Sequence, residues 1–101
     1  MNKKSDQAHL LLMQETIVRF EQSPFSLETL LSVTRSLEEL LNVLVDVDQD
    51  WKELFRTQWW ELELTSSLMM DEEREDFTEE DKQSVSLALK NMKEMIKKNL
   101  C

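Results

Sequence analysis

The feature that most constrains this chain is the absence of glycine from its 101 residues, which also include only one proline. Glycine supplies the positive-φ positions of tight hairpins, phosphate-binding loops and many active-site turns. P-loops, dinucleotide-binding fingerprints and nucleophile elbows are therefore excluded in their usual forms. Leucine, glutamate, lysine and methionine, which are abundant here, are all good helix formers. The composition predicts an all-α fold.

The length suits one domain with a single modest core. Apolar residues recur at helical spacing in four segments, and the chain has no internal repeat. We therefore expect a single domain over residues 1–101, folded as a bundle of about four helices. The expected helices cover about 5–22, 26–45, 50–69 and 78–99, with an acidic connection at 70–77.

Polar residues at the expected helix starts are candidate N-caps. Ser5 and Ser26 can cap the first two helices. Asp50 with Glu53 resembles a capping box for the third helix, which is expected to begin near Asp48 or Asp50. For the fourth helix, the candidate box is formed by Thr78 and Asp81.

The apolar positions of these helices predict the core. One tryptophan helix, 50–69, is apolar around much of its circumference, because Trp60 and Leu64 lie on a different face from Trp51 and Phe55. It either sits centrally in the bundle or leaves a tryptophan for a partner. The predicted core residues are Leu10, Met13, Ile17, Phe20, Leu27, Leu30, Leu31, Leu37, Leu40, Leu41, Leu44, Val45, Trp51, Leu54, Phe55, either Gln58 or Trp59, Leu62, Val85, Ala88, Leu89, Met92 and Ile96, with Thr34 as a gap in the second stripe.

An acidic run at 71–81 holds eight carboxylates against one arginine, and it carries seven of the nine excess negative charges of the chain. Its last members, Glu79 to Asp81, suit the first turn of a helix, where the dipole favours anions. Residues 71–76 have no such explanation, apart from a role as a solvated loop. A concentrated negative patch attracts a basic partner and repels nucleic acid and anionic lipid. We therefore expect neither nucleic-acid nor membrane binding.

The sequence offers no convincing catalytic or metal site. The segment from Asp46 begins like a calcium loop, but the positions that need glycine and glutamate hold Trp51 and Thr57. The chain has one histidine, His9, and one cysteine, Cys101, which are too few ligands for a tetrahedral zinc site or for the di-iron site of a helical bundle. Carboxylates on an exposed connection all ionise similarly, which does not suit acid–base catalysis. We expect no cofactor, no metal and no enzymatic activity.

The expected compartment is the cytoplasm. The longest apolar run, 10–13, is far too short to span a bilayer, and charged residues around it do not fit a secretion signal. The single cysteine, Cys101, cannot form a disulfide within the chain, which agrees with a reducing environment.

Just over half of the chain, from Leu40 to Ile96, resembles small helical immunity proteins of bacterial polymorphic toxin systems, including contact-dependent growth inhibition. The resemblance is carried by the tryptophan segment Asp48–Glu63, a charged spacer, the segment Phe77–Asp81 and the amphipathic pattern Ala88–Lys93. It implies a cytoplasmic antidote that binds and blocks the C-terminal domain of one cognate toxin. Many of those toxins are nucleases, although the toxin type does not carry over.

The charge pattern supports the same hypothesis independently, because a nuclease presents basic residues that fixed carboxylates could occupy in place of phosphate. Charge complementarity would speed association, and a buried aromatic would supply affinity. The expected electrostatic contacts are Asp71, Glu72, Glu73, Glu75 and Asp76, with Trp60 as the aromatic anchor and Asp46 and Asp48 extending the acidic surface.

Two other hypotheses remain open from the sequence. A helical adaptor or secretion chaperone could hold a partner's amphipathic segment on methionines at 69–70 and 92–95, because methionine surfaces are adaptable. Mimicry of DNA toward a regulator would need carboxylates spaced like phosphates along one face, which suits a short run less well. A surplus apolar stripe could also pair two copies of the chain.

Overall fold

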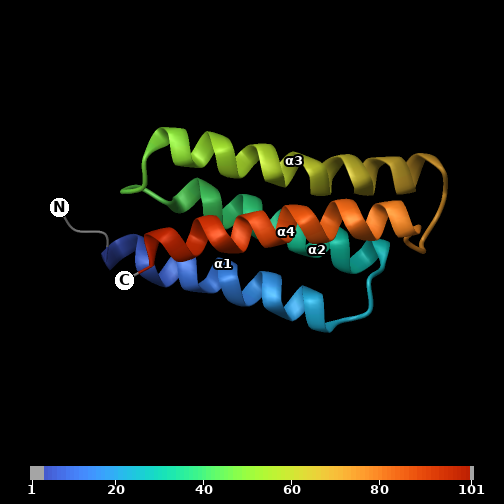
Figure 1. The fold of residues 1–101 in the computed structure, drawn as a ribbon, viewed down its shortest axis with the longest axis horizontal. Coiled ribbons are helices and arrows are strands. Elements are labelled where there is room, and N and C mark those ends of the chain that lie inside the picture. Colours follow the sequence, from blue (N-terminus) through green and yellow to red (C-terminus); the bar gives the residue numbers. More distant parts are fainter. Residues whose placement is uncertain (1–3, 101) are drawn as a thin grey trace.

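The computed structural model describes residues 4–100 and shows four helices packed as an antiparallel bundle, with no strand in that part of the chain (Figure 1). This confirms the predicted all-α architecture. The helices are α1 (Lys4–Gln22), α2 (Leu27–Val43), α3 (Gln49–Asp71) and α4 (Glu79–Asn99). Helices α1 and α3 occupy diagonal corners, because each packs on both α2 and α4 and they do not pack on each other.

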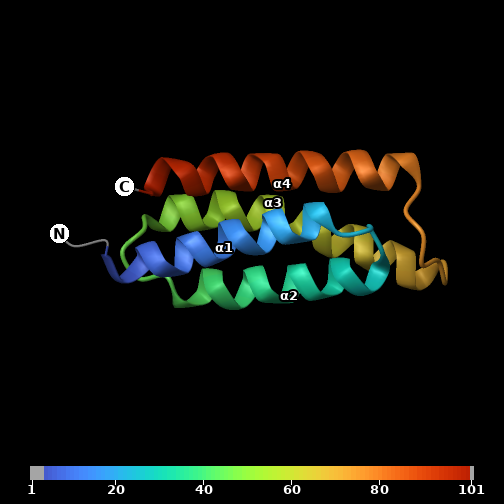
Figure 2. The same ribbon diagram turned by 90° about the horizontal axis from the view of Figure 1, so that it is seen from below.

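The connections lie at alternate ends of the bundle. The α1–α2 turn and the α3–α4 connection lie at one end of the bundle. The α2–α3 loop lies at the other end, together with the N-terminal end of α1 and the C-terminal end of α4 (Figures 1 and 2). The C-terminal end of α3 and the connection after it project furthest along the long axis (Figure 1). The α3–α4 connection is therefore exposed at an extremity of the molecule.

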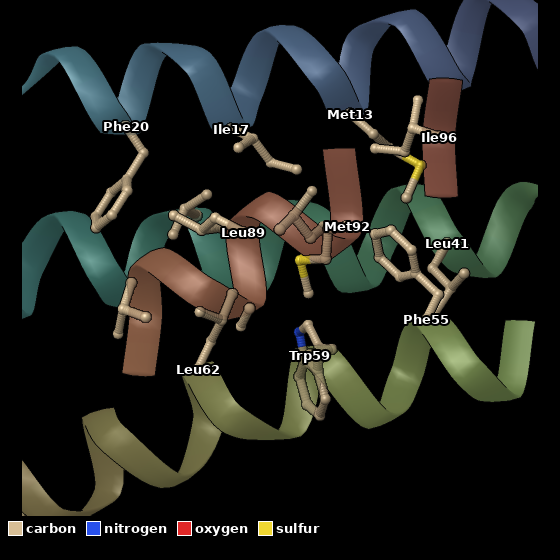
Figure 3. Packing of buried hydrophobic residues seen from close by; sticks show 14 of the residues in the cluster. Met13, Ile17, Phe20, Leu41, Phe55, Trp59, Leu62, Leu89, Met92 and Ile96 are labelled. Carbon is tan, nitrogen blue, oxygen red and sulfur yellow. The ribbon is translucent and has the colours of Figure 1, made fainter. Parts of the chain in front are cut away.

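The core runs along the centre of the bundle and receives side chains from all four helices (Figure 3). Most of the predicted core is buried, including the whole predicted stripes of α1 and α4. Trp59 is buried as well, and its indole Nε1 donates a hydrogen bond of 2.8 Å to the carbonyl oxygen of Thr34. The gap in the α2 stripe is thus a buried threonine, whose own hydroxyl donates to Leu30 O at 2.6 Å.

Two predicted core residues are wrong, since Leu54 and Val45 are exposed. Leu54 lies on α3, a corner helix that buries only the side facing α2 and α4. Val45 lies beyond the end of α2, where Leu44 is extended, so the helical spacing no longer decides where its side chain points.

The predicted helix caps are confirmed at α2 and α4, where Ser26 and Thr78 each form a complete capping box. The cap predicted for α1 is wrong, and so is the box of Asp50 with Glu53 predicted for α3, although α3 does begin next to Asp48 as expected. Ser5 lies within α1, which the structure already describes at Lys4, and α3 is preceded by Asp48, whose side chain makes no capping hydrogen bond. Because α3 begins at Gln49, Asp50 falls inside the helix and cannot act as the cap.

Candidate functional site

The five predicted carboxylates of the acidic run form one exposed turn. We call residues 71–76 the acidic turn, and its carboxylates are Asp71, Glu72, Glu73, Glu75 and Asp76. All five are exposed at the end of the bundle that α3 and its connection extend (Figure 1). The structure therefore brings together the five residues that the sequence analysis grouped as electrostatic contacts.

The acidic turn begins as a Schellman motif, a helix ending that usually contains glycine. The amide of Glu73 donates to Met70 O at 3.1 Å, and the amide of Arg74 donates to Met69 O at 2.8 Å. The position that glycine normally takes is held by Glu73, with φ of 55°. A side chain in this left-handed conformation costs about 1–2 kcal/mol. The chain accepts that cost and keeps an exposed carboxylate at this position.

Replacing Glu73 with glycine is expected to raise the free energy of unfolding by about 0.5–1 kcal/mol. The relief of left-handed strain exceeds the entropy that glycine adds to the unfolded chain. Chemical denaturation of Glu73→Gly and of the wild type measures the difference. Glu75→Gly removes the same charge where φ is not positive and is expected to destabilise the protein. Equal effects of the two substitutions would contradict the strain argument.

Arg74 orders the acidic turn from within. Its guanidinium donates to the side chain of Glu72, to Asp76 O at 3.1 Å and to Asp81 Oδ2 at 2.8 Å. Hydrogen bonds to Asp81 and Glu72 raise the pKa of Arg74 further above its usual value. Burial opposes the ionisation of Asp81, but Arg74 and Thr78 outweigh it and hold the pKa of that carboxyl below its usual range.

The acidic turn is also attached to the start of α2. The amide of Leu27 donates to Glu75 O at 3.3 Å. Just after the turn, Phe77 packs edge-on against Phe25 with ring centroids 5.3 Å apart, and Phe25 in turn packs on Phe20 at 4.7 Å. The hydrogen bonds of Arg74 and the contacts with the start of α2 hold the backbone of the turn, so the carboxylates are presented from an ordered segment.

Three of the exposed apolar side chains of α3 form a row that runs toward the acidic turn. Trp60, Leu64 and Leu68 are 52%, 52% and 49% exposed and follow one another at four-residue spacing. We call these three residues the α3 ridge. The predicted alternatives for this helix are thereby decided: α3 is at a corner of the bundle, Trp59 is in the core, and Trp60 is outside it with its ring 5.3 Å from that of Trp59.

Asp46 and Asp48 do not extend the acidic surface formed by the turn. Both lie in the α2–α3 loop, at the opposite end of the bundle from the acidic turn (Figure 2). Helix α3 has 23 residues, and at about 1.5 Å per residue it separates the two ends by roughly 35 Å. The prediction that Asp46 and Asp48 join the acidic turn in one surface is therefore wrong, because the two connections lie at opposite ends of α3.

One buried carboxylate that was not predicted from the sequence organises this α2–α3 loop. Asp6 of α1 is 1% exposed, and it accepts hydrogen bonds from the amides of Val45, Asp46 and Val47 at 3.0, 2.7 and 3.1 Å. An acidic residue four positions before Leu10 falls on the same face as the apolar stripe, and this was the available signal. Its role is to hold the loop that positions the start of α3.

The methionines do not form an exposed groove. Met13, Met69 and Met92 are buried in the core, Met95 is partly buried, and Met70 is exposed. The initial methionine lies outside the described residues. The surface that motivated an adaptor is therefore reduced to Met70, near the C-terminal end of α3.

Within residues 4–100, no group of three or more histidine, cysteine, aspartate or glutamate side chains is arranged to hold a metal ion. The only cysteine, Cys101, lies outside the described residues. Among the described helices, none combines the length and the apolar character needed to cross a membrane.

No family model matches the chain, and comparisons with curated proteins and with solved structures find no match.

Proposed function

We propose that this chain is an immunity protein that binds and blocks the C-terminal domain of a basic bacterial toxin, with a nuclease as the expected toxin activity, in the cytoplasm of the producing cell. The observation that carries the proposal is the acidic turn, which places five carboxylates on a fixed backbone at the tip of the bundle. The resemblance of the segments around α3 and α4 to helical immunity proteins points to the same class.

The acidic turn suits a blocker of a phosphate-binding cleft. Carboxylates there can pair with the lysines and arginines that a nuclease presents to its substrate, and the charge complementarity raises the rate of encounter. Because Arg74 and the Schellman hydrogen bonds already order the turn, binding costs little additional conformational entropy. Trp60 stands on the adjoining helix as the exposed aromatic that can supply affinity.

The proposal is tested by capturing partners on the tagged chain in an extract of the producing organism at about 0.15 M salt. We expect one partner at equal stoichiometry, with a basic C-terminal domain. Once separated from the chain, that domain is expected to degrade DNA or RNA, and adding the chain back is expected to stop the degradation.

Other outcomes would contradict the proposal in different ways. A captured partner whose activity the chain does not inhibit would exclude immunity. Several unrelated partners, each bound through an extended segment, would favour the helical adaptor or secretion chaperone instead.

A further inference from the structure

The α3 ridge has the geometry of a helix-packing surface. Side chains four residues apart form the rows that insert between side-chain rows of a neighbouring helix. Trp60, Leu64 and Leu68 make such a row and are about half exposed. The ridge points away from α2 and α4, the two helices on which α3 packs. It is an apolar row with no partner in the described part of the chain.

Carboxylates surround the ridge. Glu61 and Asp71 are exposed on α3, Glu63 is half-buried, and Glu72, whose carboxylate already pairs with Arg74, continues the same four-residue row past Leu68. The cation that begins the row, Arg56, donates from Nη2 to Asn42 Oδ1 at 3.3 Å and so is directed toward α2. The apolar row therefore has an acidic border on its sides and at its C-terminal end.

We infer that the α3 ridge receives one α-helix of the partner, apolar along one face and carrying lysine or arginine on both sides of that face. This inference rests on the proposed function and names the element of the toxin that the chain recognises beside the acidic turn. A helix packed across the ridge buries Trp60, Leu64 and Leu68 and brings its flanking cations to Glu61, Glu63 and Asp71. The contact adds a fifth helix to the corner of the bundle that α3 occupies.

Charge distinguishes this occupant from a second copy of the chain. The chain carries a net charge of −9, and a second ridge would bring its own acidic border against the first. Repulsion between the carboxylates of the two copies opposes this pairing. A cationic amphipathic helix has the complementary arrangement, in which the apolar rows meet and the charges attract.

The probe is a helical peptide of leucine and lysine about 18 residues long, equal to five turns, with all leucines on one face. A second peptide has glutamate in place of every lysine. Each is titrated into the full chain at about 0.15 M salt. Binding is followed by amide chemical shifts and by the fluorescence change that Trp60→Phe removes. We expect the lysine peptide to bind, the glutamate peptide not to bind, and the shifts to centre on residues 60–72.

Matched variants test the site. Leu64→Lys, on the ridge, is expected to weaken binding of the lysine peptide by about tenfold or more. Leu11→Lys, on α1 at the diagonal corner, changes an equally exposed leucine (49%) and is expected to leave binding unchanged. Equal weakening by both, or shifts confined to the acidic turn, would overturn the inference. So would a dimer of the free chain that Leu64→Lys dissociates.

The outcome is distinguishable from that of the proposed function. Capture of a toxin that the chain inhibits, with the ridge unprotected from hydrogen exchange in the complex, would overturn the helix-docking inference and leave immunity standing. Peptide docking on the ridge, together with a captured partner that the chain does not inhibit, would exclude immunity and leave the ridge as a helix-docking surface.

Discussion

Asp6→Ala is expected to lower the free energy of unfolding by about 3–5 kcal/mol. A buried carboxylate that accepts several hydrogen bonds contributes through each of them, and its removal leaves three successive amides of the α2–α3 loop without their acceptor. Of the three lost hydrogen bonds, the one from Val47 N is expected to cost the most stability, because it is buried and its amide would be left without an acceptor away from water. Urea denaturation with linear extrapolation measures the loss.

Asp6→Asn is the control for the charge. It keeps one carbonyl oxygen as an acceptor, so we expect it to retain part of the stability that alanine loses. Asp48→Asn changes an exposed carboxylate at the end of the same loop, whose side chain makes no capping hydrogen bond, and is expected to have little effect. A loss below about 1 kcal/mol in Asp6→Ala would show that water replaces the carboxylate, as at an ordinary surface hydrogen bond.

The contribution of Asp6 also depends on pH. Burial opposes ionisation of its carboxyl, but the amides of Val45, Asp46 and Val47 and the charge of Lys52 outweigh it and hold the pKa below the usual 3.8. A carboxyl with a lowered native pKa stabilises the fold fully above its unfolded pKa and loses that contribution as the pH falls through the native one. The stability difference between wild type and Asp6→Ala is therefore expected to be constant near neutral pH and to shrink below about pH 3.8.

The helices could be predicted because each has a local signal. Apolar spacing identified the buried stripes of α1 and α4, and capping residues marked the starts of α2 and α4. Asp6 could not be assigned in this way, because its partners lie about 40 positions further along the chain. Periodicity identifies the face on which a carboxylate lies, but only packing shows which amides it meets.

The residues of the acidic turn could be predicted from the sequence, but the backbone conformation of the turn could not. The five carboxylates of the acidic turn were grouped correctly, but the Schellman ending was hidden because its usual glycine is replaced by Glu73. The separation of Asp46 and Asp48 from the turn was available in principle, since consecutive connections of an antiparallel bundle lie at opposite ends. The exposure of Trp60 depended on α3 being a corner helix, which the spacing of its own residues does not decide.

If the proposed immunity function holds, converting the five carboxylates of the acidic turn to amides is expected to slow association with the toxin domain by about 100-fold at low salt. Electrostatic steering accounts for factors of about 10 to 1,000 in association rates, and it is screened by added salt. The wild-type rate should therefore fall steeply with ionic strength, while the rate of the amide variant should depend on it weakly. Stopped-flow mixing over a range of salt concentrations measures both rates.

A second variant separates a located patch from net charge. It converts five exposed carboxylates elsewhere on the surface to amides, so it changes the net charge by the same amount: Glu15, Glu28, Glu39, Asp50 and Glu94. We expect its association rate to stay within a few-fold of the wild type, because steering depends on where the charge lies relative to the docking surface. Equal slowing of the two variants would assign the effect to overall charge. An unchanged rate in the acidic-turn variant would show that the toxin binds elsewhere, while immunity itself would still stand. Unfolding measurements on both variants check that each remains folded, because the amides remove the pair between Glu72 and Arg74 in one variant and the first-turn carboxylates Glu28 and Asp50 in the other.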